Sequence, residues 1–308
     1  MTLFCADPAE KLLTLTPENT FSVETDGFSG SFYKPKKNFF PGKVVLLAGG
    51  SDGQYALTRL VAEQFAERGI AALALAIWNG PGLPEAIQSI PLEYAQKAAQ
   101  WLKLKGYPKI GIWGFSIGAQ YALLSATRFP DLIHCAIAAS PSAVCTQGMN
   151  IKMGTAQEPK LLDCSAFSYK GMDLPYAGIK MDKIRILTDS LLSRSYSMRA
   201  SFDGMLEHAP KESEIPVELI NGPVLLLAAD HDTVWNSKES ADRIAARLKV
   251  HHFSFPVTYY HYEYASHYLL PCSVMSRMIF AEERKHPHKC RQSNDEAFEA
   301  TLEFLQVW

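Results

Sequence analysis

The sequence lacks the features that mark several large classes of protein. Its 308 residues include 30 Lys and Arg against 32 Asp and Glu, a net charge of −2, so nothing draws the chain as a whole to nucleic acid. No run of about 18 apolar residues occurs, so no membrane span is expected. There is no repeat, low-complexity tract or charged tail. With 47% hydrophobic residues, we expect one large domain over residues 1–308.

Two further absences concern metals and targeting. None of the six cysteines forms a C-x-x-C pair, so neither a zinc ribbon nor a thioredoxin-like site is predicted, and free thiols are expected. The first residues, MTLFCADPAEKLLTL, lack the basic start and long apolar run of a secretory signal. We therefore expect a cytoplasmic protein with no metal and no cofactor.

Apolar runs alternate with amphipathic helical stretches along most of the chain. Runs such as KVVLLA before Gly49 and IAALALAI at 70–77 are typical of strands buried on both faces. Their alternation with helices predicts an α/β fold with a doubly wound, mostly parallel sheet. Alternating residues at 21–25 and 30–35, separated by Asp-Gly, predict a hairpin at one antiparallel edge. The capping-box spacing of Ser293 and Glu296 predicts the start of a closing helix.

The alternation breaks down between residues 144 and 221. This stretch mixes Gly, Pro, Ser, Met and charged residues, with only short helical signals such as KIRILTDSLL. It is too long for a plain connection between a strand and a helix. We interpret it as a cap or lid inserted into the sheet domain.

The strongest local signal is the pentapeptide Gly114-Phe115-Ser116-Ile117-Gly118. An apolar strand precedes it and a helix follows at once, which is the context of a nucleophile elbow. The two glycines remove side chains that would clash in so sharp a turn, which raises the serine hydroxyl above the sheet. A serine hydroxyl is a poor nucleophile at neutral pH, so a base must take its proton.

The partners of such a serine follow it in the order acid and then histidine, each after a later strand. His267 follows the last predicted strand, in Tyr-Ala-Ser-His-Tyr, and is the predicted base. Asp232 follows the strand PVLLLA and is the favoured acid, which would hold the tautomer of the imidazole. Asp230 in the same turn stays an alternative.

An oxyanion hole needs two donors close to the nucleophile. The backbone N–H groups of Ile117, at the helix start, and Ser51, in the loop after KVVLLAGG, are the candidates. The glycine-rich AGGSDG could instead be a phosphate loop, but it lacks the Walker lysine and the full G-x-G-x-x-G spacing.

At these motifs the chain resembles the catalytic domain of the acyl-CoA thioester hydrolase and bile acid-CoA:amino acid N-acyltransferase family. The resemblance lies in VVLLAGGSDG, GLPEAIQSIPLEY, GIWGFSIGAQYALL, DHDTVWNS and YASHYLLP, from about residue 40 onward. It implies an α/β-hydrolase fold with Ser116 as nucleophile, Asp232 as acid and His267 as base. The chain departs from the family at Ile117, a position that is often basic there.

The resemblance implies an acyl-CoA thioester substrate that is hydrolysed through an acyl-serine. A carboxylesterase of small or medium acyl esters and an acyl-CoA:amino acid N-acyltransferase remain alternatives, as does a non-catalytic binding protein on the same fold. Serine rather than cysteine at position 116 favours hydrolysis. We further expect the segment 144–221 to shape an acyl pocket with the large apolar side chains Met149, Met153, Phe167, Met172 and Tyr176.

Overall fold

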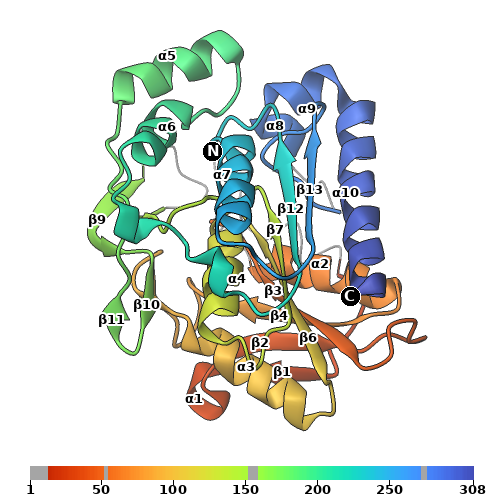
Figure 1. Ribbon diagram of the computed structural model, residues 1–308. Helices are drawn as coiled ribbons and strands as arrows, with labels where there is room; N and C mark the ends of the chain where they lie inside the picture. The colour runs from red at the N-terminus through yellow and green to blue at the C-terminus, as the bar shows by residue number, and fades with distance from the viewer. Residues whose placement is uncertain (1–12, 52–54, 152–158, 272–275) are drawn as a thin grey trace.

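A computed structural model describes residues 13–51, 55–151, 159–271 and 276–308. Its centre is an eight-stranded sheet in the order β1-β2-β4-β3-β6-β7-β12-β13, which runs through the molecule in Figure 1. From β4 to β13 all neighbouring strands are parallel. The strands span β1 (Asn19–Phe21), β2 (Ser29–Tyr33), β3 (Lys43–Ala48), β4 (Ala71–Ala76), β6 (Lys109–Phe115), β7 (Cys135–Ala139), β12 (Val224–Ala229) and β13 (Val257–Tyr262).

Helices cover both faces of the sheet, so the alternate residues of each strand pack into two separate cores. In β3, Val44 and Leu46 pack on the face covered by α3, α4 and α7, while Val45 and Leu47 pack on the face covered by α2 and α10. Fully burying one such side chain is worth about 1.5–3 kcal/mol, which explains why these strands are apolar throughout. The helices span α2 (Tyr55–Glu67), α3 (Glu93–Leu104), α4 (Ile117–Arg128), α7 (Ser237–Val250) and α10 (Pro287–Val307).

The predicted doubly wound sheet is confirmed, with two differences in detail. Strand β2 pairs antiparallel with both β1 and β4, as expected of an edge hairpin. Residues 23–25, expected to belong to a strand at 21–25, instead form the one-turn helix α1 (Val23–Asp26), capped by Ser22 and ended by Gly27 at a φ of 75°. The closing helix α10 begins at Pro287 rather than near Ser293, because proline favours the first turn of a helix.

The segment 144–221 lies between β7 and β12 and holds small elements of its own. Strand β8 (Gln147–Asn150) pairs with β9 (Lys160–Ser165). A second small sheet is formed by β10 (Phe167–Tyr169) and β11 (Met172–Asp173) together with β5 (Ile90–Pro91), which comes from outside the segment. They are followed by α5 (Lys183–Ser193) and α6 (Arg199–Glu207), then by two 3₁₀ turns at Lys211–Ser213 and Val217–Leu219. In Figure 1 this green segment lies along one side of the sheet, with α5 at the top.

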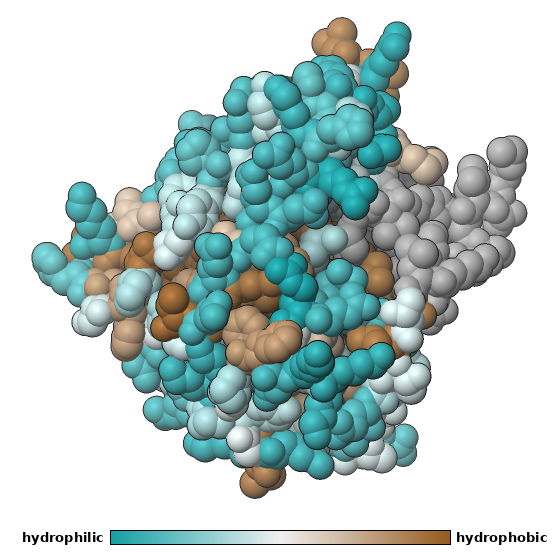
Figure 2. Space-filling model, turned by 90° about the vertical axis from the view of Figure 1, so that its right-hand side faces the viewer, coloured by the Kyte–Doolittle hydropathy of each residue, from teal (hydrophilic) through white to brown (hydrophobic). Residues whose placement is uncertain are grey.

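The last helices close the opposite side. After β13 come α8 (Ser276–Ile279) and α9 (Ala281–Lys285), which lead into α10. Figure 2 shows the molecule from this side, with a largely hydrophilic surface crossed by a band of hydrophobic residues near its middle. Within the described residues, none of the helices combines the length and the apolar character needed to cross a membrane.

Candidate active site

Ser116 lies in the sharp turn between β6 and α4. Its backbone has a φ of 56° and a ψ of −121°, a conformation that costs an L-residue free energy and marks functional turns. Close approach of the backbone explains the two glycines. A Cβ at Gly114 would lie 2.0 Å from the carbonyl oxygen of Gly118, and a Cβ at Gly118 would lie 2.2 Å from that of Ala48. The elbow predicted from the pentapeptide is therefore present, and only glycine fits on either side of the serine.

The structure joins the three predicted residues into one chain of hydrogen bonds. The Ser116 hydroxyl lies 2.8 Å from Nε2 of His267, and Nδ1 of His267 lies 2.9 Å from Oδ2 of Asp232. All three side chains are buried, with no residue more than 3% exposed. In this geometry the imidazole can accept the hydroxyl proton while the carboxylate holds its tautomer.

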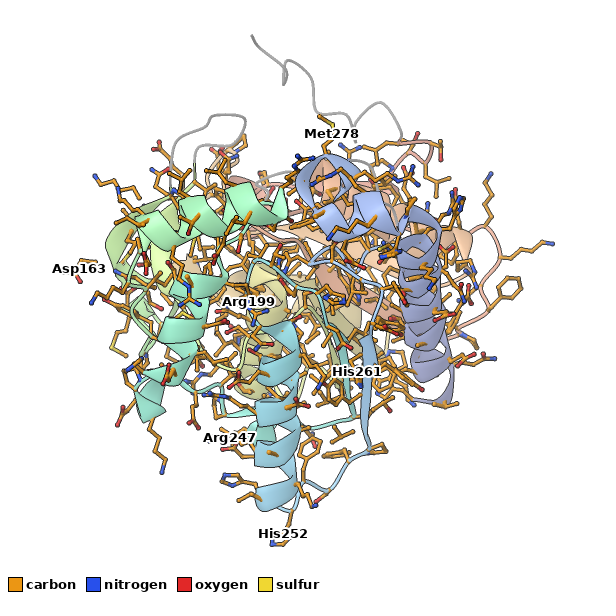
Figure 3. The ribbon with its side chains drawn as sticks, turned by 90° about the horizontal axis from the view of Figure 1, so that it is seen from above. Asp163, Arg199, Arg247, His252, His261 and Met278 are labelled. Atoms are coloured by element: carbon orange, nitrogen blue, oxygen red, sulfur yellow. The ribbon has the colours of Figure 1, made fainter. Side chains whose placement is uncertain are left out.

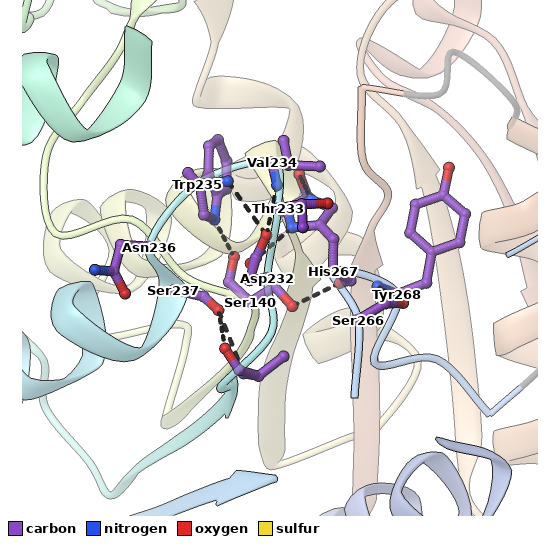
Figure 4. A network of polar contacts seen from close by, with 12 residues as sticks. Ser140, Asp232, Thr233, Val234, Trp235, Asn236, Ser237, Ser266, His267 and Tyr268 are labelled. Carbon is purple, nitrogen blue, oxygen red and sulfur yellow. Dashed lines mark hydrogen bonds and ion pairs between the residues drawn. The ribbon is translucent and has the colours of Figure 1, made fainter. Parts of the chain in front are cut away.

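The two aspartates of the acid turn have different partners. Oδ1 of Asp232 accepts hydrogen bonds from the backbone N–H groups of Val234 and Trp235, at 2.9 and 3.2 Å, which fixes the carboxylate (Figure 4). Asp230 lies instead 3.0 Å from Nδ1 of the exposed His261. The geometry thus separates the alternatives, because Asp232 contacts His267 and Asp230 contacts a histidine at the surface.

Several side chains that we did not single out from the sequence hold His267 in place. The Ser140 hydroxyl donates to the backbone carbonyl of His267 at 2.7 Å, and the Trp235 indole N–H donates to the carbonyl of Ser140 at 3.1 Å. The rings of Phe115 and Trp235 each lie 5.3 Å from the imidazole. Ser140 follows β7 with a φ of 48°, which its sequence AASPS does not reveal.

A buried carboxyl group also contacts the loop of His267. The hydroxyl of Ser266, next to His267 in the chain, donates to Oε1 of Glu283 at 2.9 Å and accepts from the backbone N–H of Tyr268. Glu283 is 2% exposed, and this burial raises the pKa of its carboxyl above the usual value. No sequence pattern indicated this contact, because Glu283 lies in a later helix, α9, and only folding brings it to Ser266.

The two predicted oxyanion donors belong to segments that meet at the elbow. Ile117 is the first residue of α4, where the backbone N–H has no acceptor within its own helix. The close approach of Gly118 to the carbonyl oxygens of Ala48 and Gly49 shows that the loop leading to Ser51 packs against this first turn. Ser51 itself is half-buried, and its role as a donor stays a prediction.

The segment 144–221 contacts the acid turn through residues other than those expected. The backbone N–H of Met198 donates to the carbonyl of Thr233, and Nη1 of Arg199 donates to that of Asp232, both at 2.9 Å. The ring of Phe202 lies 5.4 Å from that of Trp235. The segment therefore contacts the turn that holds Asp232 through α6 and the residues that lead into it.

The side chains predicted to shape an acyl pocket lie in varied settings. Phe167 is buried in the core beside Tyr121, whereas Met172 is 68% exposed. Met149 is buried and the Tyr176 hydroxyl donates to Asp163, while Met153 lies outside the described residues. The role of this set in an acyl pocket therefore stays a prediction.

The described residues hold no group of three or more His, Cys, Asp or Glu side chains that could bind a metal ion. Four cysteines, namely Cys135, Cys145, Cys164 and Cys290, are free thiols, and Cys5 and Cys272 lie outside the described residues.

The fold and the elbow define an α/β hydrolase. Solved structures of similar fold include a putative dienelactone hydrolase from Klebsiella pneumoniae, with a TM-score of 0.55 and 15% identity over 94% of this chain and 98% of that one. An α/β hydrolase from a deep-sea metagenome library has a TM-score of 0.56 and 14% identity, over 94% of this chain and 96% of that one. At these identities the likeness concerns the fold alone.

The chain belongs to the BAAT / acyl-CoA thioester hydrolase C-terminal family, whose model matches residues 90–287. The mitochondrial acyl-coenzyme A thioesterase 2 of Mus musculus is 28% identical over 244 residues, covering 78% of this chain and 47% of that protein. The bile acid-CoA:amino acid N-acyltransferase of Mus musculus is 28% identical over 223 residues, covering 70% of this chain and 46% of that protein. The chain thus spans about half the length of the curated relatives that it matches.

Proposed function

We propose that this protein is a serine hydrolase that cleaves acyl-CoA thioesters, with Ser116 as nucleophile, His267 as general base and Asp232 as the orienting acid. The observation that carries the proposal is the buried chain of hydrogen bonds from Ser116 through His267 to Asp232 at a strained elbow. The family supports the choice of an acyl-CoA substrate.

The chemistry follows from the positions of the side chains. His267 Nε2 takes the proton of Ser116 as its oxygen attacks the thioester carbonyl, and the C–S bond breaks to release the thiol, which takes up that proton. Water then attacks the acyl-serine and gives a proton to the same nitrogen. The bond between the acyl carbon and Ser116 Oγ breaks, His267 returns the proton to Oγ, and the carboxylic acid is released. N–H donors at the start of α4, with the positive end of its dipole, stabilise the oxyanion.

Three alternatives differ from the proposal in donor, acceptor or chemistry. A carboxylesterase would use the same triad on oxygen esters, and an N-acyltransferase would pass the acyl group to an amine. A binding protein on this fold would have no turnover. The strained backbone of Ser116 favours a reacting serine over a binding protein, because such strain usually persists where function requires it. The complete hydrogen-bonded chain from Ser116 to Asp232 supports the same choice.

The test compares kcat/KM on acyl-CoAs with that on p-nitrophenyl esters of the same acyl chains, with and without glycine or taurine. We expect a preference for acyl-CoA and free acid as the product in either case. A strong preference for oxygen esters would make the protein a carboxylesterase, and diversion of most product to an amide would make it a transferase.

The Ser116→Ala variant tests the nucleophile directly. Turnover should fall by a factor on the order of 10⁶, and labelling by a fluorophosphonate should disappear. Ser142→Ala serves as the matched control, since Ser142 is also buried but donates to the carbonyl of Val144. Near-normal activity or labelling of Ser116→Ala would refute the acyl-serine mechanism.

A further inference from the structure

Helix α5 turns an apolar face toward solvent. Its side chains Ile184, Leu187, Leu191 and Leu192 are 79, 60, 68 and 85% exposed. Their spacing of i, i+3, i+7 and i+8 places them on one side of the helix. Ile186 alone among its apolar residues is half-buried and packs on the core. Folding therefore leaves most of the apolar surface of α5 unused, which marks a docking surface.

The surface continues onto α8. Met278 is 69% exposed, and the backbone N–H of Tyr196 donates to the carbonyl of its neighbour Ile279 at 3.0 Å. The backbone N–H of Ala281 donates to the Ser195 hydroxyl at 3.1 Å. Figures 1 and 3 show α5 and α8 at the same end of the molecule. We call Ile184, Leu187, Leu191, Leu192 and Met278 the apical surface.

Exposed basic side chains lie along the two segments that carry the apical surface. Between residues 182 and 194 and between 276 and 285, six exposed side chains are basic, namely Lys183, Arg185, Arg194, Arg277, Arg284 and Lys285. The same stretches hold four carboxylates. Asp182 is exposed, Asp189 lies 3.8 Å from Nε of Arg185 on the same helix, and Glu283 is fully buried, which leaves a net charge of 6 − 4 = +2 for the two stretches. The net charge of −2 for the whole chain therefore conceals a local excess of exposed cations at this end.

We propose that the apical surface docks on lipid bilayers that contain anionic lipids, with α5 lying in the interface. An amphipathic helix with apolar side chains on one side and cations beside them binds such surfaces through both its apolar area and its charge. The cations argue against a second copy of the chain as the occupant. A two-fold symmetric contact would bring the same positive residues of both copies together.

Docking there would place the candidate active site close to the membrane. The residues after α5 hold the acid turn, since Thr233 donates its hydroxyl to the carbonyl of Tyr196 and accepts from the N–H of Met198. The triad lies at the carboxyl ends of the strands, the same end of the sheet that carries α5 in Figure 1. Acyl substrates that partition into a bilayer would thus meet the enzyme at this end.

Co-sedimentation with phosphatidylcholine vesicles, with and without phosphatidylserine, tests the proposal on the intact chain. We expect binding to the anionic vesicles, weaker binding to the neutral ones, and release near 1 M salt, where the screening length is about 3 Å. The double variant Leu187→Gln with Leu191→Gln should reduce the partition coefficient about tenfold or more. Fully burying even one leucine side chain changes a binding constant by about that factor. Lys183→Gln with Arg185→Gln should reduce it by about fivefold per residue.

The control pair is Leu104→Gln with Val307→Gln, two side chains that are 88 and 87% exposed elsewhere. It should leave vesicle binding unchanged, and melting curves check that every variant folds. The proposal is overturned if the unaltered protein ignores anionic vesicles, or if the control pair weakens binding as much as the α5 pair. A dimer that the α5 pair dissociates would instead make the surface an interface between copies. Because the assay reads binding, its result is independent of hydrolysis by Ser116.

Discussion

Replacing Asp232 with asparagine should disable the imidazole through its tautomer rather than its position. Oδ1 of Asp232 accepts from the N–H groups of Val234 and Trp235, and Oδ2 faces Nδ1 of His267. In Asp232→Asn the amide oxygen must keep the place of Oδ1, because only an acceptor satisfies the two N–H groups. The amide NH₂ then faces Nδ1 of His267, which becomes an acceptor, and the ring proton moves to Nε2.

With its proton on Nε2, the imidazole cannot accept the proton of Ser116. The equivalent change in a serine triad lowers kcat by about 10⁴, which corresponds to about 5.5 kcal/mol of transition-state stabilisation. We expect this loss in kcat on a p-nitrophenyl ester, measured by stopped-flow or steady-state kinetics, with little change in KM. The melting temperature should stay near that of the unaltered protein, because both backbone hydrogen bonds are kept.

Asp230→Asn is the matched control, two residues away in the same turn. Its carboxylate pairs with His261, whose side chain is 51% exposed, so its loss should change kcat by less than about twofold. A loss in Asp230→Asn as large as in Asp232→Asn, or a loss below tenfold in Asp232→Asn, would show that this assignment of the acid is wrong.

Three further changes probe the elbow and the loop of His267. Gly114→Ala places a methyl group 2.0 Å from the carbonyl oxygen of Gly118, so activity and soluble yield should collapse together, as judged by activity and circular dichroism. Ser140→Ala leaves the buried carbonyl of His267 without that donor, which should cost about 1–3 kcal/mol and lower the melting temperature by a few degrees; an unchanged value would contradict this. Glu283→Gln removes a carboxyl whose folded pKa is raised from the usual 4.5. The stability that the protonated Glu283 contributes is present below pH 4.5 and is lost as the pH rises through the raised value. The stability of the variant relative to the unaltered protein should therefore increase as the pH rises above 4.5, and a relative stability that falls with pH would refute this.

The course of the sheet was predictable because burial on both faces demands continuous apolar runs. The strands β3, β4, β6, β7 and β12 each read as such a run, and their order along the chain with intervening helices implied parallel pairing. The prediction of a strand at 21–25 was wrong at residues 23–25, which form a helical turn together with Asp26. Their alternation of apolar and polar residues fits a strand, but Ser22 and Gly27 cap a helix of one turn instead. Such short elements depend on local caps more than on periodicity.

The sequence by itself predicted the elbow at Ser116 and the order in which Ser116, Asp232 and His267 follow their strands. Each depends on neighbours in the chain: the glycines beside Ser116, and the strand that precedes each of Asp232 and His267. The choice between Asp230 and Asp232 needed the tertiary structure, because the direction of a side chain in a turn depends on hydrogen bonds that local sequence leaves open. Ser140 and Glu283 meet the loop of His267 from 127 and 17 residues away, and the face of α5 became an apical surface only when folding left it uncovered. Contacts between distant segments are set by how the layers pack, so only the packed chain could reveal them.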